Sequence, residues 1–117
     1  FGHTIGHAVE QLSGFSLLHG EAVAIGMGLE ARLGERAGHT APGTAQRIED
    51  CLRAAGLPVG RPAGMSPADI VAATHGDKKA RRGQVEYALP ARVGEMAGAD
   101  TNYGIPLDDR LVAKVLE

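Results

Sequence analysis

The sequence predicts a mainly α-helical domain with a small β-hairpin. Hydrophobic residues make up 44% of the 117 residues, but aromatics only 3%, and Trp is absent. The core must therefore be built from Ala, Val, Leu, Ile and Met, whose side chains suit close helix packing. Apolar residues recur at helical spacing along most of the chain, and alternation typical of a strand is confined to its last third. The length suits one domain, so we expect a single domain over residues 1–117.

The first two helices are expected over residues 2–13 and 20–37. In the first, Ile5, Val9 and Leu12 are spaced to form one apolar face, and Gly14 ends the helix. The second is apolar almost continuously up to residue 33, which predicts burial on most sides.

Glycines interrupt this second helix at Gly26 and Gly28. Each costs about 1 kcal/mol relative to Ala inside a helix, which is tolerable where another backbone packs closely. We therefore expect a close helix contact there.

A third helix is expected over residues 44–55, ended by Gly56. Its expected buried face carries Ile48, Cys51, Leu52 and Ala55. The single cysteine excludes an internal disulfide, and its helical setting favours a small buried hydrophobe.

A fourth helix opens at Ser66, with a proline in its first turn and an acid at the third position, and extends to Thr74. Residues 84–89 alternate as a half-buried strand and are ended by Pro90, and residues 92–97 would complete the hairpin. A terminal helix starts within residues 105–109. Its expected buried side carries Leu111, Val112, Val115 and Leu116.

The charge pattern excludes several partners. A formal charge of -2, a pI near 6.2 and only a short basic run at residues 78–82 give no footprint for nucleic acid or an anionic membrane. No stretch approaches the roughly 18–20 apolar residues of a membrane span, and no signal peptide opens the chain. We expect a cytoplasmic protein. The chain starts without Met, directly on its most distinctive motif, which favours a fragment or a processed chain.

Three of the five histidines fall within residues 3–19. His3 and His7 are one helical turn apart, about 5–6 Å between Cβ atoms, and the break before His19 lets it fold back towards them. Imidazole is a common ligand of zinc and related metals. The pattern favours a metal site, with capping or core histidines as the alternative. A zincin site is excluded because Thr4 stands where His-Glu-x-x-His needs its Glu.

Three blocks, residues 2–10, 18–27 and 77–79 with the following 83–90, resemble the 3-dehydroquinate synthases of the sugar-phosphate cyclase superfamily. They occur in family order and at family-like spacing along nearly the whole chain. The resemblance implies the C-terminal, helical metal- and substrate-binding domain of a two-domain α/β plus α enzyme. The N-terminal NAD-binding domain is not among these residues, and no Gly-x-Gly-x-x-Gly fingerprint follows a predicted strand to replace it.

By the same resemblance, His3 and His19 match two ligands of Zn²⁺ or Co²⁺, and the third ligand is a Glu upstream of these residues. His7 matches a catalytic histidine beside the substrate phosphate. Lys78 matches a phosphate-contacting lysine, and Lys79 could share that role, with a solvated basic turn as the alternative.

Other polar residues near these motifs have less specific interpretations. Glu10 and Glu21 either orient an imidazole or cap and solvate a helix. His39 lies in a polar loop and His75 follows the fourth helix, so neither is expected to bind metal.

The implied reaction converts 3-deoxy-D-arabino-heptulosonate 7-phosphate to 3-dehydroquinate and phosphate, in the shikimate pathway to aromatic amino acids. It is a carbon-oxygen lyase reaction with bound NAD, and the resemblance suggests a homodimer. Two alternatives stay open. One is a related cyclase that makes aminodehydroquinate or 2-deoxy-scyllo-inosose. The iron-dependent alcohol dehydrogenases share a similar two-domain architecture. The other is an inert helical fragment that needs its missing half and exposes apolar surface.

Overall fold

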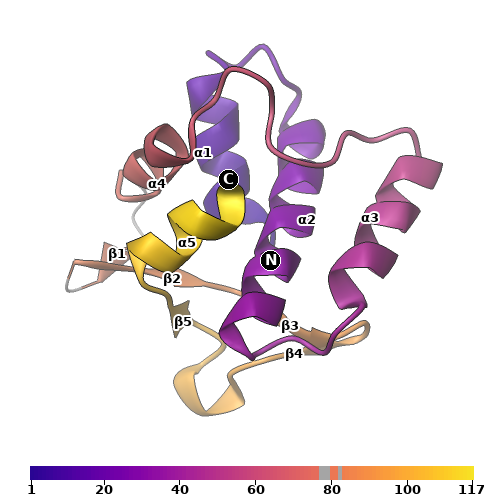
Figure 1. Cartoon of the computed structure of the whole chain (residues 1–117), viewed down its shortest axis with the longest axis vertical. Coiled ribbons are helices and arrows are strands. Elements are labelled where there is room, and N and C mark those ends of the chain that lie inside the picture. Colours follow the sequence, from indigo (N-terminus) through magenta and orange to yellow (C-terminus); the bar gives the residue numbers. More distant parts are fainter. Residues whose placement is uncertain (77–79, 82) are drawn as a thin grey trace.

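The computed structural model describes residues 1–76, 80–81 and 83–117 (Figure 1). The helices are α1 (His3–Leu12), α2 (His19–Ala37), α3 (Thr44–Ala54), α4 (Pro67–Thr74) and α5 (Asp109–Leu116). The strands are β1 (Ala80–Arg81), β2 (Gln84–Tyr87), β3 (Pro90–Arg92), β4 (Glu95–Met96) and β5 (Ile105–Pro106), and η1 (Ala99–Thr101) is a 3₁₀ turn. The predicted class, a mainly helical domain with a small β component, is confirmed. Among the described residues, no helix is both long and apolar enough to cross a bilayer.

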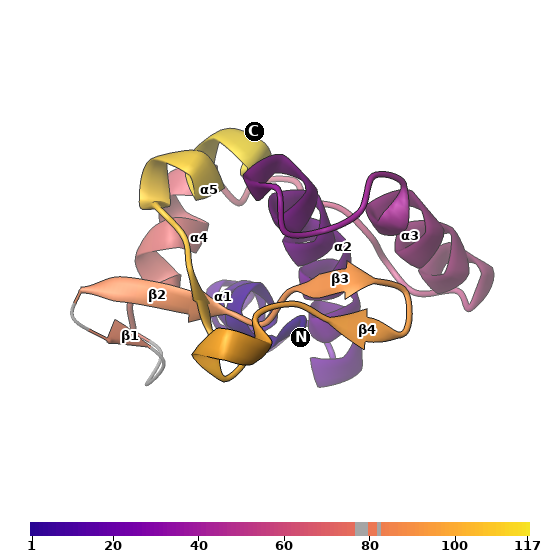
Figure 2. The same cartoon turned by 90° about the horizontal axis from the view of Figure 1, so that it is seen from below.

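Helix α2 runs through the centre of the molecule. Helices α1, α4 and α5 gather on one of its sides and α3 lies on the other (Figure 1). The short strands lie together at one end of the helical layer, as the view from below shows (Figure 2). This arrangement leaves the start of α2 beside α1.

The crossing of α1 and α2 is as close as Gly26 predicts, whereas a Cβ on Gly28 would meet the Glu49 side chain of α3 at 3.2 Å and no backbone. A Cβ on Gly26 would collide with the carbonyl oxygen of Gly2 and would lie 2.7 Å from the backbone nitrogen of Gly6. Gly2 itself has φ of 83°, a left-handed conformation that favours glycine. The two backbones touch because neither carries a side chain at the crossing.

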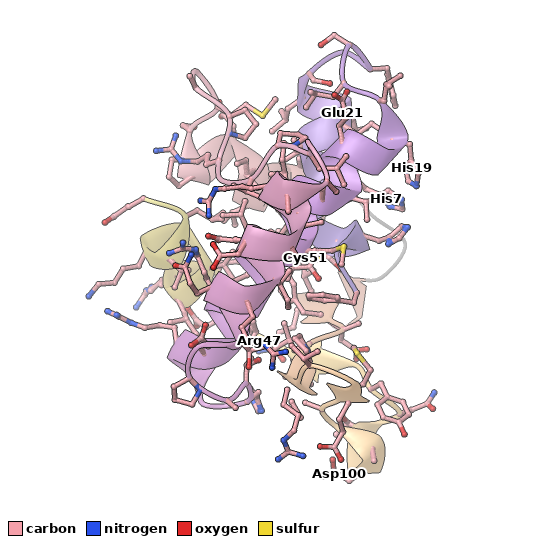
Figure 3. The ribbon with its side chains drawn as sticks, turned by 90° about the vertical axis from the view of Figure 1, so that its right-hand side faces the viewer. His7, His19, Glu21, Arg47, Cys51 and Asp100 are labelled. Atoms are coloured by element: carbon pink, nitrogen blue, oxygen red, sulfur yellow. The ribbon has the colours of Figure 1, made fainter. Side chains whose placement is uncertain are left out.

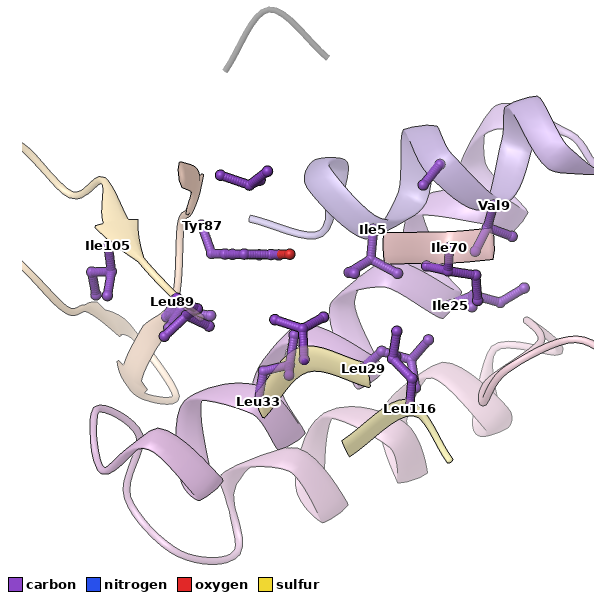
Figure 4. Packing of buried hydrophobic residues seen from close by; sticks show 14 residues of the cluster. Ile5, Val9, Ile25, Leu29, Leu33, Ile70, Tyr87, Leu89, Ile105 and Leu116 are labelled. Atoms are coloured by element: carbon purple, nitrogen blue, oxygen red, sulfur yellow. The ribbon is translucent and has the colours of Figure 1, made fainter. Parts of the chain in front are cut away.

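The core is continuous across the helices and the strands (Figure 4). Helix α2 is buried over most of its middle, as predicted, because α1, α3 and α5 all pack on it. The Tyr87 ring extends from β2 toward Ile5 of α1. The largest buried aliphatic side chains include Ile5, Val9, Leu33, Ile70, Leu89 and Leu116.

The strand pairing differs from the predicted hairpin of 84–89 with 92–97. β2 lies between β1 and β5 and is antiparallel to both, while β3 pairs with β4 in a separate ribbon. Pro90 does not end a strand but begins β3, because a proline is tolerated at the first residue of a short edge strand.

Residues 105–106 form β5 rather than the start of the terminal helix. α5 begins after Asp108, whose carboxylate accepts a hydrogen bond from the Arg110 backbone nitrogen at 2.8 Å.

The predicted buried face of α3 is wrong. Cys51 is exposed, and α3 buries Thr44, Ala45 and Glu49 instead. Two short hydrogen bonds from Arg32 of α2 to the Glu49 carboxylate, at 2.5 and 2.6 Å, draw this polar face inward. The opposite face of α3, which includes Cys51, then faces outward, on the side of the molecule that Figure 3 shows.

Candidate metal and substrate site

Three histidine side chains converge at the junction of α1 and α2. The ring centroids are 5.3 Å apart for His3 and His7, 5.4 Å for His3 and His19, and 5.9 Å for His7 and His19. Figure 3 shows His7 and His19 side by side on one edge of the molecule. The prediction that His19 folds back to the pair is confirmed.

The turn between the helices makes this convergence possible. Gly14 and Phe15 both have positive φ, 65° and 63°, which reverses the chain directly after α1. The Ser13 hydroxyl accepts from the Leu17 backbone nitrogen at 3.4 Å and so steadies the turn. The chain returns to begin α2 at His19, next to the helix it has just left.

The His3 ring is oriented by its own backbone. Its Nδ1 lies 3.1 Å from the carbonyl oxygen of Phe1. A carbonyl only accepts, so Nδ1 carries the hydrogen and Nε2 is left as the atom that can bind a metal.

The His19 ring is oriented by a carboxylate. Its Nδ1 lies 3.3 Å from Glu10 Oε2, and the Glu10 side chain is only 17% exposed against 57% for His19. Glu10 therefore takes the orienting role that was one of its two alternatives. Glu21 takes the other role and caps α2, because its carboxylate accepts from the Leu18 backbone nitrogen at 2.9 Å.

The donor set suits a divalent metal but is incomplete. Metal-binding histidines usually donate their second ring N–H to a carbonyl or a carboxylate. His3 Nδ1 has such a carbonyl partner, and His19 Nδ1 lies 3.3 Å from a carboxylate oxygen. Yet no group of three or more His, Cys, Asp or Glu side chains in the described ranges is placed to hold a metal ion. Two converging imidazoles would fit part of a coordination shell.

His7 faces a cavity of about 380 Å³. Its lining residues are Thr4, His7, Ala8, Glu10, Gln11, Phe15, Ala73 and Gly76. Gly76 directly precedes Asp77, the first residue of the Asp-Lys-Lys motif, in the sequence. Lys78 and Lys79 themselves lie outside the described residues.

The other two histidines have structural surroundings. His39 is exposed after the end of α2. His75 Nε2 lies 2.7 Å from Asp109 Oδ2 and so joins the end of α4 to the start of α5. A larger hollow of about 680 Å³ is lined by Arg32, Arg36 and Lys114 among others, and no histidine lines it.

Sequence reasoning missed Glu30. This residue of α2 is fully buried, and its carboxylate accepts hydrogen bonds from two backbone nitrogens of the α1 start. The available signal was an acidic residue inside the otherwise apolar stretch of the second helix. Such a residue is seldom fully buried without partners.

Comparison with known proteins places these features in a family. The family model for the 3-dehydroquinate synthase C-terminal region matches residues 1–80. The 3-dehydroquinate synthase of Caldanaerobacter subterraneus subsp. tengcongensis is 44% identical over 97 residues, which cover 82% of this chain and 27% of that protein. The enzyme of the same name from Nostoc punctiforme is 36% identical over 118 residues, covering 100% of this chain and 31% of that protein. The chain thus spans about a quarter to a third of these relatives.

A solved structure is similar over nearly the whole chain. It is the 2-deoxy-scyllo-inosose synthase complexed with carbaglucose-6-phosphate, NAD⁺ and Co²⁺. The TM-score is 0.82 at 25% sequence identity, and the match covers 99% of this chain and 32% of that one. The helical arrangement described above is therefore one that a sugar-phosphate cyclase also uses.

Proposed function

The chain belongs to the 3-dehydroquinate synthase family, and from this premise we propose that it forms the C-terminal metal- and substrate-binding part of such an enzyme. The reaction would convert 3-deoxy-D-arabino-heptulosonate 7-phosphate to 3-dehydroquinate and phosphate. The convergence of His3, His7 and His19 carries the proposal. Identity of 44% to a 3-dehydroquinate synthase, against 25% to the 2-deoxy-scyllo-inosose synthase, favours this reaction over the related one.

His3 and His19 would supply two ligands to Zn²⁺ or Co²⁺. The oxygens near both Nδ1 atoms support this role, because they leave each Nε2 as the ring nitrogen available to a metal. The third ligand would come from residues outside this chain. When bound, the metal would act as a Lewis acid that acidifies a substrate hydroxyl.

His7 would work beside the substrate phosphate. It lines the 380 Å³ cavity, and an imidazole there can donate or accept a proton in the reaction. Lys78 would contact the same phosphate as a point charge. Its position two residues beyond Gly76, which lines that cavity, supports the assignment.

NAD would bind to a domain outside residues 1–117, and the assembled enzyme would be a homodimer. The absence of a complete ligand group among the described residues supports a further expectation, that the 117 residues alone do not turn over substrate. Their role would be to position the substrate for chemistry shared with the rest of the enzyme.

A chimera tests this function directly. The 117 residues would replace the matching segment of the Caldanaerobacter enzyme, to which they are 44% identical. With NAD⁺ and Co²⁺, we expect phosphate release from 3-deoxy-D-arabino-heptulosonate 7-phosphate. His19→Ala should lower kcat by at least about 100-fold because a ligand is lost, whereas His39→Ala, in an exposed loop, should not change it.

Two results would contradict the proposal. One is a folded chimera that binds NAD⁺ but releases no phosphate. The other is a chimera in which His19→Ala is as active as His39→Ala, which would remove His19 from the ligand set.

A further inference from the structure

Glu30 joins the two helices that carry the histidines. Its side chain is fully buried within α2. Oε1 accepts a hydrogen bond from the Gly2 backbone nitrogen at 3.0 Å, and Oε2 accepts one from the Ile5 backbone nitrogen at 2.9 Å. These two nitrogens lie on either side of His3 in the first turn of α1.

The start of α1 needs such a partner. The first N–H groups of a helix have no acceptor within the helix, and they are normally capped by a side chain at the N-cap. The N-cap of α1 is Gly2, which has no side chain, so the cap comes from another helix. A carboxylate is well suited to this place, because the helix N-terminus is its positive end.

The cap fixes His3 relative to His19. Glu30 and His19 belong to the same helix, α2. The two hydrogen bonds that Glu30 accepts therefore hold the first turn of α1 against the helix that also carries His19. The backbone contact at Gly26 brings the helices close enough for a carboxylate to reach. The 5.4 Å separation of the His3 and His19 rings is thereby tied to the Glu30 hydrogen bonds.

We propose that Glu30 is a positioning residue that caps α1 from α2 and holds His3 opposite His19. The functional purpose of this cap rests on the proposed metal role of the two histidines. The positioning itself can be tested without metal, because the cap and the separation of the two rings can both be measured in the metal-free chain.

The test compares buried carboxylates by NMR in the 117-residue chain. Glu30→Ala removes both acceptors, while Glu30→Gln keeps one and turns an NH₂ group toward the other N–H. Glu49→Ala is the matched control, because Glu49 is only 1% exposed but binds Arg32 rather than α1. The readouts are hydrogen exchange at the Ile5 amide and the cross-peak between the His3 and His19 rings.

We expect Glu30→Ala to speed Ile5 exchange at least about tenfold more than Glu49→Ala does, and to remove the ring cross-peak. Glu30→Gln, which is less disruptive to folding, should give an intermediate rate and a weaker cross-peak. If both Glu30 variants keep the cross-peak at the intensity seen in Glu49→Ala, the positioning role is overturned.

A Co²⁺ titration of the same samples separates this proposal from the function. If the Glu30 variants lose the ring contact and the unsubstituted chain binds no Co²⁺, the positioning role is supported. The proposal that His3 and His19 bind a metal within this chain is then contradicted. Co²⁺ binding that needs His3 and His19 but is equal in the Glu30 and Glu49 variants would overturn the positioning role and leave the metal role intact.

Discussion

At the residue scale, Tyr87 buries a polar atom, its phenol oxygen, in the hydrophobic core. Its phenol oxygen has no hydrogen-bond partner of good geometry among the described residues. Burial raises the pKa of this phenol well above its ordinary value; the nearby Thr74 hydroxyl opposes part of the rise, and the charge of Glu30 adds to it. The folded protein thus holds the Tyr87 proton more tightly than the unfolded chain does.

This difference predicts alkaline destabilisation. Below pH 10 both states keep the proton, so Tyr87 gives no pH dependence. Above it the unfolded chain loses the proton first, and the free energy of unfolding should fall by about 1.4 kcal/mol per pH unit. In urea unfolding between pH 9 and 11.5, Tyr87→Phe should remove this part of the slope. An unchanged slope in the variant would contradict the shifted pKa.

Gly26 is the residue on which the α1–α2 crossing depends. In Gly26→Ala the new Cβ would meet the Gly2 carbonyl and the Gly6 nitrogen, both backbone atoms that cannot turn aside. We expect a loss of about 3 kcal/mol or more in the free energy of unfolding, measured by urea denaturation. Gly20→Ala is the control, because nothing lies within 4 Å of a Cβ there, and it should be neutral or slightly stabilising.

At the residue scale, the sequence predicted the histidine cluster but not its supports. The spacing of His3 and His7 is local, and the break before His19 marks a turn, so their convergence follows from helix geometry. The Glu30 cap depends on which residues of two helices meet at a crossing. That register is a property of packing and cannot be read from either helix alone.

At the element scale, the Arg32–Glu49 ion pair helps to hold α3 to α2, together with the hydrogen bonds that the Glu35 carboxylate of α2 accepts from the Gly43 and Ala45 backbone nitrogens at 2.7 and 3.0 Å. Arg32 donates two hydrogen bonds to Glu49, whose side chain is only 2% exposed, while half of the Arg32 side chain is exposed. The hydrogen bond to Glu49 raises the pKa of the Arg32 guanidinium despite partial burial. The Glu49 carboxylate is therefore shielded from water, whereas solvent partly screens the charge of the Arg32 guanidinium.

Removing the guanidinium should loosen α3 selectively. We expect Arg32→Ala to cost about 1–3 kcal/mol, because Glu49 would be left buried without its bidentate donor. Hydrogen exchange followed by mass spectrometry should show faster exchange in α3 than in α1. Arg36→Ala, one turn along the same exposed side of α2, is the control. Equal protection of α3 in the two variants would contradict the attachment.

Elements with local signals were predicted well, and those that depend on partners were not. The Ser66 hydroxyl accepts from the Asp69 backbone nitrogen at 3.1 Å, as the cap pattern indicates. By contrast, β5 contains only Ile105 and Pro106, and it exists because β2 offers an edge to pair with. The buried face of α3 was missed because a bidentate ion pair outweighed its apolar stripe.

At the scale of the whole molecule, the helices form one core but leave apolar surface exposed. Phe15 and Leu18 are 70% and 71% exposed in the turn beside the histidines, and Val93 is 50% exposed. Apolar side chains also line a cavity of about 260 Å³ along α3. The fragment alternative predicts exposed apolar surface of this kind.

The helical class of the whole molecule followed from its composition, and its family from three sequence blocks. The number and identity of metal ligands did not follow from the fold. His3 and His19 are brought together within this chain, and the described residues contain no group of three or more His, Cys, Asp or Glu side chains placed to hold a metal ion.

The central claim is that His3 and His19 form a preset half of a metal site, and calorimetric titration of this chain with Co²⁺ tests it most directly. We predict weak binding of one ion per chain, because two imidazoles converge and the described residues add no third ligand to them. The His3→Ala/His19→Ala variant should bind at least about tenfold more weakly, and His39→Ala should match the unsubstituted chain. Equal affinity in the double variant, or no binding by the unsubstituted chain, would contradict the claim.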